Sequence, residues 1–350
     1  MKFSVITPSF RQLDWLAACV ASVRDQAAEK AESGNLKAET KNEDRRSKIA
    51  PPPLAVEHII QDAGSPGIED FARKIAADFY RDGQLEFKAV ACSEERVASE
   101  CGVSTPNSGC PTPDSSHATS PILPDTPSYH ISIYCEPDEG MYDAINRGLK
   151  RSTGDICSYL NCDEQYLPDA LKLVSGTFES SNETHIVTGD CILVREDLQP
   201  LAYRRSVPPK SDHLRASHFN IQSSSIFFRR HLIDRGYFFD SSYKRIADVV
   251  WMDRLLRDSI FPCHLPQALS AFFFTGKNMG EDDVSANESH AWRKMGGHGR
   301  TSTLLLKLQH RVKKALAGAY CYRNIKTKLY SRSNTNRRSP VEGRVGWSWK

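Results

Sequence analysis

The chain lacks several features that would place it in common protein classes. No apolar run approaches the roughly 18 residues that a membrane-spanning helix needs, and the N-terminus enters a strand-like segment without the regions of a signal peptide. No Gly-x-Gly-x-x-Gly motif follows that segment, which argues against a Rossmann dinucleotide-binding enzyme. The formal net charge of +3 is too small to indicate nucleic-acid binding. These absences predict a cytoplasmic protein without a nucleic-acid partner.

Cysteine pairs of the kind that bind zinc are also missing. The ten cysteines are scattered, and no Cys-x-x-Cys pair occurs, so we expect reduced and mostly buried thiols.

The 350 residues are enough for one large domain with an appendage. A composition of 39% hydrophobic and 25% charged residues is typical of a globular protein with polar extra segments.

Two strand-like segments near the N-terminus end in polar turns. The first runs from Phe3 to Thr7 and leads through a Pro-Ser turn into an amphipathic helix over about 13–26. The second, AVEHII, ends in Asp62 and a Gly/Ser turn. Polar side chains that follow apolar strands are typical of binding sites in open α/β sheets.

A third unit, from Glu136 to Pro168, is the most informative part of the chain. Apolar residues at helical spacing predict a helix over Met141 to Lys150, and Ile156 to Leu160 forms a short apolar strand. That strand runs into Asn161-Cys162-Asp163-Glu164, where two adjacent acids repel each other. A divalent cation between them, Mg²⁺ or Mn²⁺, would explain the pair. An ordinary solvated loop is the alternative.

These segments, in this order, resemble the inverting glycosyltransferases of the GT-A fold (family 2 type). The resemblance rests on TPSF, IIQDAGSPG, EPDEGMYDAINRG and YLNCDE, matches the branch with SEPDxGMYDAxNKG and YLNSDD signatures, and covers roughly residues 2–269. It implies an α/β GT-A fold with a mixed, mainly parallel sheet flanked by helices. The implied activity is metal-dependent, hexosyltransferase-like transfer from a nucleoside diphosphate sugar, with UDP expected. The implied acceptor is a hydroxyl group of a glycan or lipid-linked glycan, in polysaccharide or glycoconjugate biosynthesis.

The expected domain covers residues 1–275, with a nucleotide-binding half over about 1–168 and an acceptor half over about 169–275. Two insertions, about 27–53 and 94–128, are polar or proline-rich and bury too little apolar surface to order themselves. We expect both to be disordered.

Residues 276–350 form a basic extension, expected to be a helix followed by a flexible tail. An apolar stripe between Leu304 and Leu316 lies beside Lys307 and Arg311. Two interpretations remain open. The helix lies on an anionic membrane, which would place the protein peripherally at its inner face, or it packs on the domain.

The resemblance implies a donor site built from strand ends. Asp62 would accept a hydrogen bond from the nucleobase, because a carboxylate offers only acceptors; a turn-former beside Gly64 is the alternative. Gly140, Asp143 and Asn146 would border the nucleoside, with helix capping as the alternative. The full set of implied donor-binding residues is Thr7, Pro8, Ser9, Asp62, Gly140, Asp143, Asn146, Asn161 and Asp163.

The acidic turn corresponds to the family's DXD motif, and the implied metal ligands are Asp163 and Glu164. The cation would stabilise charge on the departing diphosphate. Glu164 departs from the usual aspartate, and its longer side chain changes the expected geometry. With Asn161, this departure also favours an alternative function, a catalytically silent homologue that binds nucleotide sugars without turnover.

The acceptor half supplies the implied general base, Asp248, at the start of a predicted helix. A carboxylate there would take the proton of the attacking hydroxyl. A helix-terminal charge favoured by the dipole is the alternative. Gln222, Ser223 and Ser224 are expected on a strand at the sugar pocket. A nucleotidyltransferase is disfavoured, because the first turn carries no glycine-rich phosphate loop.

Overall fold

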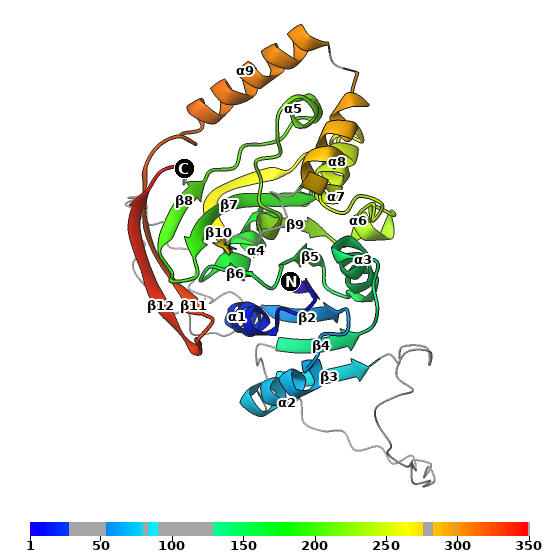
Figure 1. Ribbon diagram of the computed structural model, residues 1–350, viewed down its shortest axis with the longest axis vertical. Helices are drawn as coiled ribbons and strands as arrows, with labels where there is room; N and C mark the ends of the chain where they lie inside the picture. The colour runs from blue at the N-terminus through cyan, green and yellow to red at the C-terminus, as the bar shows by residue number, and fades with distance from the viewer. Residues whose placement is uncertain (28–53, 80–82, 90–128, 276–282, 298, 349–350) are drawn as a thin grey trace.

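The computed structural model describes residues 1–27, 54–79, 83–89, 129–275, 283–297 and 299–348 (Figure 1). The two predicted insertions lie, apart from residue 27, outside the described residues. In the described chain a ten-stranded mixed sheet forms the centre, and helices lie on both of its faces. The predicted α/β class, with a mixed, mainly parallel sheet flanked by helices, is confirmed.

The N-terminal half of the sheet is entirely parallel. Its strand order is β3-β4-β2-β1-β5. The strands are β1 (Lys2–Ser9), β2 (Ala55–Asp62), β3 (Gly83–Ala89), β4 (Tyr129–Cys135) and β5 (Ile156–Tyr159). The helices of this half are α1 (Leu13–Arg24), α2 (Ile68–Phe79) and α3 (Met141–Arg151). Because parallel strands end at one edge, the polar turns that the sequence placed after β1, β2 and β5 all belong to the same edge of the sheet.

The second half of the sheet is mixed. The order continues β5-β9-β7-β10-β6, with β9 antiparallel to both neighbours and β8 paired to β7. The strands are β6 (Glu164–Tyr166), β7 (Ile186–Arg195), β8 (Pro200–Arg204), β9 (Ile226–Arg229) and β10 (Cys263–Phe274). The helices are α4 (Ala170–Ser180), α5 (Ser211–Ala216), α6 (His231–Asp234) and α7 (Ala247–Arg257).

The segment expected to carry a pocket strand is different. Residues Ser223–Ser225 form a short 3₁₀ helix, η1, and β9 begins only at Ile226. The Ser225 amide donates to the Gln222 carbonyl at 2.9 Å, which closes a turn over these residues. The serine hydroxyls hold this turn against other strands: Ser224 Oγ donates to Ser270 Oγ at 2.9 Å, and Ser225 Oγ donates to the Asp190 carbonyl at 2.9 Å. The expectation of a strand over Gln222–Ser224 is therefore wrong.

Each face of the sheet has its own apolar core. Side chains alternate along β1, so Phe3 and Val5 join the core under α1, α2 and α4, while Ile6 joins the core under α3 and α7. Helix α3 approaches β1 closely at Gly148, where an added Cβ would lie 2.5 Å from Ile6 Cγ2. This close approach fixes the helix that follows the EPDEG segment against the strand that carries the first turn.

The C-terminal extension is ordered where the structure describes it. It consists of α8 (Asp283–Lys294), α9 (Arg300–Leu316) and a hairpin of β11 (Arg323–Ser331) and β12 (Asn334–Val345). Ile325, Leu329 and Val341 of the hairpin join the core beside α1. The expected flexible tail is therefore wrong for residues 323–345. No helix in the described ranges is long and apolar enough to cross a membrane.

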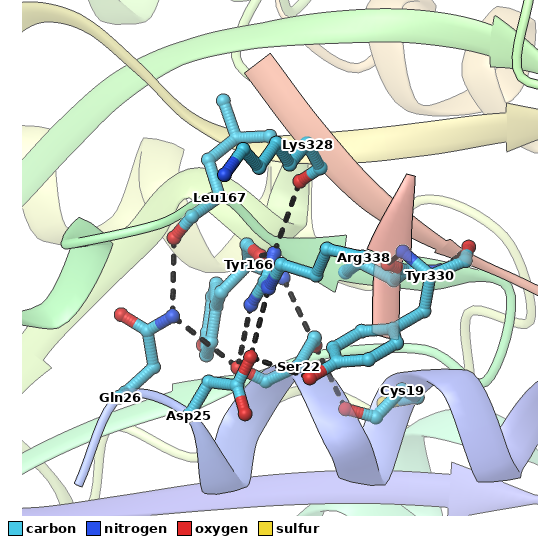
Figure 2. Close-up of polar contacts among 10 residues, drawn as sticks. Cys19, Ser22, Asp25, Gln26, Tyr166, Leu167, Lys328, Tyr330 and Arg338 are labelled. Carbon is cyan, nitrogen blue, oxygen red and sulfur yellow. Dashed lines mark hydrogen bonds and ion pairs between the residues drawn. The ribbon is translucent and has the colours of Figure 1, made fainter. Parts of the chain in front are cut away.

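An arginine whose side chain is 9% exposed holds the hairpin to the domain (Figure 2). Arg338 pairs with Asp25 at 2.9 Å and donates to the carbonyl of Tyr166 at 3.0 Å. The Tyr330 hydroxyl donates to the same Asp25 carboxylate at 2.6 Å, and its backbone exchanges two hydrogen bonds with the Gln165 side chain. The hairpin thus supports β6, the strand that begins with Glu164. The sequence does not indicate this role, because the hairpin is rich in exposed charged residues.

Candidate functional site

The polar turns after β1 and β5 lie side by side. Strand β5 pairs with β1, and beyond it the Leu160 amide donates to the Ile6 carbonyl at 2.9 Å. One step further, the Cys162 thiol donates to the Pro8 carbonyl at 3.2 Å. The predicted residues Thr7, Pro8 and Ser9 therefore border the acidic turn.

Asp62 reaches the same edge, because the register pairs Ser9 with Asp62 at the ends of β1 and β2. Its carboxylate is fully buried and serves its own turn. Oδ1 accepts from the amides of Gly64 at 3.0 Å and Ser65 at 2.6 Å, and Oδ2 accepts from the Ser65 hydroxyl at 2.8 Å. This is the turn-forming role weighed above, and the bond to a nucleobase stays a prediction.

Glu164 closes the acidic turn from inside the fold. Its side chain is fully buried. Oε2 accepts from the Asn161 amide at 2.9 Å, and Oε1 accepts from Gln222 Nε2 at 3.0 Å. Burial and the neighbouring Asp163 charge raise the pKa of Glu164 to about 7. These bonds give Glu164 a positioning role in the turn, and its predicted role as a metal ligand stays a prediction.

The turn also offers oxygen atoms to a hard cation. Asn161 Oδ1 is buried and has no hydrogen-bond partner among the described residues, and the neighbouring Asp163 is partly exposed. Buried acceptors are rarely left unpaired. Within the described ranges no group of three His, Cys, Asp or Glu side chains could hold a metal. The donor set therefore fits Mg²⁺ or Mn²⁺ only if a bound ligand supplies further oxygens, as phosphates do.

The EPDEG segment builds the start of α3. Gly140 has φ +122°, a conformation that side chains disfavour, and its amide donates to Asp138 Oδ1 at 2.9 Å. Asp143 pairs with Arg147 at 2.9 Å. Asn146 is bonded in both directions to the backbone of Phe239, at 2.7 and 3.0 Å. In these contacts Asp143 and Asn146 order the fold, and their predicted nucleoside contacts stay predictions.

Asp248 lies at the first turn of α7, as predicted. Its Oδ1 accepts from the Tyr142 hydroxyl at 3.0 Å and from the Val249 amide at 2.9 Å. Burial raises the pKa of Asp248 to about 6, although these hydrogen bonds act in the opposite direction. The side chain remains partly exposed. A carboxylate with this pKa is ionised at neutral pH yet more basic than an ordinary aspartate.

Two buried neighbours connect these acids. Burial and the Asp248 charge raise the pKa of the Tyr159 hydroxyl, and Glu164 adds to the shift. Burial also raises the pKa of the Cys162 thiol, and both Asp163 and Asp62 contribute. Tyr159 ends β5 and Cys162 lies in the acidic turn. The carboxylates therefore shift the pKa of side chains that belong to one edge of the sheet. Each of the predicted acids after β2, after β5 and at α7 thus lies near Tyr159 or Cys162, which follow each other at this edge.

Comparisons with known proteins extend this description. No family model matches the chain. A region of 127 residues, 34% of the chain, is 28% identical to PGL/p-HBAD biosynthesis glycosyltransferases of Mycobacterium bovis and Mycobacterium tuberculosis. The matched region covers 44% of those proteins, so the chain spans less than half the length of the curated relatives it matches.

Two solved structures give weaker likenesses. S. aureus TarS 1-349 in complex with UDP has a TM-score of 0.48 and 13% identity, over 90% of this chain and 72% of that one. The mannosyltransferase PcManGT from Pyrobaculum calidifontis, in complex with GDP-Man and Mn²⁺, has a TM-score of 0.45 and 12% identity, over 91% and 75%.

Tyr142 is the residue of this site that the sequence reasoning missed. It is buried in the core under α3 and α7, and its hydroxyl joins the two helices by bonding Asp248. Its place between Met141 and Asp143, in the quoted EPDEGMYDAINRG segment, was the available signal. Apolar spacing alone marks it only as a core residue.

Proposed function

We propose that the chain is a GT-A-type glycosyltransferase that moves a sugar from a nucleoside diphosphate, with UDP the expected nucleotide, to a hydroxyl acceptor. The observation that carries the proposal is the meeting of the acidic turn with the ends of β1 and β2, close to Asp248. The mycobacterial relatives, named as glycosyltransferases, support the same reaction class.

In this proposal each residue has a distinct task. Asn161 Oδ1 and Asp163 would hold a divalent cation at the diphosphate end of the donor. When bound, the cation neutralises charge on the leaving diphosphate. Glu164 keeps the turn in shape through its bonds to Asn161 and Gln222.

Asp248 takes the proton of the acceptor hydroxyl. The hydrogen bond from Tyr142 holds its Oδ1, which leaves Oδ2 for the acceptor. One carboxylate acting as base, with no covalent intermediate, corresponds to inversion at the anomeric carbon. Hydroxyls do not ionise at neutral pH, so this proton transfer contributes directly to the rate.

A second candidate is a nucleotide-sugar-binding protein without turnover. It is favoured by the full burial of Glu164, whose carboxylate is already used by Asn161 and Gln222. Asp163 is the only acidic side chain of the turn left for a cation in both candidates; in the silent binder this single carboxylate, with Asn161, would neutralise the leaving group too poorly for turnover.

A panel of nucleoside diphosphate sugars, each incubated with Mg²⁺ or Mn²⁺, separates the two candidates. We expect release of free nucleoside diphosphate from a UDP-sugar, at least by slow hydrolysis when no acceptor is added. Binding of UDP-sugars without any release, with and without a mixture of glycan acceptors, would contradict the glycosyltransferase and support the silent binder. Neither binding nor release would contradict both.

A further inference from the structure

Helix α9 has its apolar face on the outside. Leu304, Leu305, Leu308, Val312 and Leu316 are 71%, 61%, 58%, 49% and 85% exposed. At 3.6 residues per turn these five positions share one side of the helix. An ordinary surface helix turns its apolar stripe toward the core. Here the arrangement is reversed.

The inner face of α9 is polar and firmly held. His310 is 3% exposed and stacks on His213 of α5, with ring centroids 5.2 Å apart. Lys314 is 7% exposed and lies 3.4 Å from His218 Nε2, and Lys313 donates to the Pro208 carbonyl at 2.6 Å. The helix therefore cannot bury its leucines on its own domain without giving up these contacts.

Helix α5 is fixed in turn to α7. Ser211 and Arg215 of α5 both bond the buried carboxylate of Asp253, at 2.5 and 2.7 Å. Figure 1 shows α9 along the outer edge of the molecule, with α5 between it and the sheet. The apolar stripe is consequently presented outward in a fixed orientation.

We propose that this apolar stripe of α9, defined by its five exposed side chains, docks on an anionic membrane surface. The stripe is bordered by Arg300, Lys307 and Arg311, all exposed, and α9 contains no acidic residue. Among the residues that the structure describes, none forms an ion pair with these three cations. Apolar side chains beside basic ones suit the boundary between acyl chains and anionic headgroups.

Charge favours a membrane over a second copy of the chain. Two α9 helices packed face to face would bring their Arg300, Lys307 and Arg311 side chains together, and like charges in contact disfavour association. An anionic lipid surface meets the same side chains with opposite charge. Binding to a membrane requires anionic lipid and weakens with salt, whereas association with a second copy requires no lipid. Experiments can therefore distinguish the two.

The test is co-sedimentation of the full chain with vesicles of phosphatidylcholine alone and of equal parts phosphatidylcholine and phosphatidylglycerol. We expect binding to the anionic vesicles only. The pair Leu304→Gln and Leu308→Gln should lower the partition coefficient at least about tenfold, since each leucine loses burial in lipid. The pair Lys307→Glu and Arg311→Glu should lower it about tenfold or more.

Two matched controls accompany the variants. Lys74→Glu with Lys172→Glu makes the same change in net charge at exposed sites on α2 and α4, and Phe261→Gln removes an exposed apolar side chain outside α9. Both should bind as the parent chain does. Circular dichroism checks that each variant is folded. If the variant with both leucines replaced does not fold, the variant with Lys307→Glu and Arg311→Glu still tests the proposal.

Absence of binding by the parent chain would overturn the proposal. Equal binding by the parent chain and the folded α9 variants would overturn it as well. Sedimentation equilibrium tests whether a second copy of the chain binds the stripe instead. If the parent chain forms dimers that the Leu304→Gln, Leu308→Gln variant does not form, and does not bind vesicles, the stripe is a dimer interface and the proposal is overturned.

Discussion

Replacing Asp248 with asparagine is expected to lower the rate of sugar transfer by about 10²- to 10⁴-fold, because the acceptor proton then has no base. The asparagine oxygen can still accept from Tyr142 and Val249, so the fold and the nucleotide site should be retained. Initial rates and UDP titrations on the same preparations measure the two effects separately. The exposed Asp240, replaced in the same way, is the matched control in the loop before α7.

The same variant should be slightly more stable than the parent chain at neutral pH. Burial raises the pKa of Asp248 to about 6, so the folded chain disfavours the charged form. Its contribution to the free energy of unfolding therefore falls as pH rises from about 4 to above 6. Removing the charge should raise the free energy of unfolding by on the order of 1 kcal/mol at pH 7, and should leave it unchanged below about pH 4. Retained turnover with unchanged stability would contradict the role of Asp248.

The second large effect is expected at Asp163. Asp163→Asn should abolish the increase in UDP affinity that Mn²⁺ provides, because an amide is a poorer ligand for a hard cation than a carboxylate. A bound cation stabilises the charge of the diphosphate by several kcal/mol. Its loss should therefore lower the affinity for UDP at least about tenfold. Isothermal titration with and without Mn²⁺ measures it.

The matched control is Asp197→Asn, an exposed aspartate in the turn between β7 and β8. It should leave the Mn²⁺ effect unchanged. UDP affinity that is independent of metal in the parent chain, or a Mn²⁺ effect that survives Asp163→Asn, would remove the cation from the site.

Local pattern located the elements of the site well. The apolar spacing of Met141, Ala144, Ile145 and Leu149 predicts a helix, and the structure has α3 over Met141–Arg151. The placement of Asp248 at a helix start was equally readable, because α7 begins at Ala247. Both signals come from residues close together in the chain, where periodicity is strong.

The partners of individual polar side chains were not readable. Whether Asp62 faces a ligand or its own turn depends on the Ser65 hydroxyl, and both residue types suit either role. The burial of Glu164 depends on Gln222, 58 residues away. The hairpin β11–β12 carries so many charged residues that its sequence predicts a flexible tail, although Arg338 pairs with Asp25 of the domain at 2.9 Å.

Hydrogen–deuterium exchange of the full chain, with and without UDP and Mn²⁺, tests most directly whether a nucleoside diphosphate binds at the carboxyl ends of β1, β2 and β5. We expect slower exchange in peptides that contain Pro8–Ser9 and Asn161–Glu164, and no change in the hairpin of residues 323–345. Saturating nucleotide that protects neither of the two turns, or that protects another face of the molecule, would contradict the proposed site.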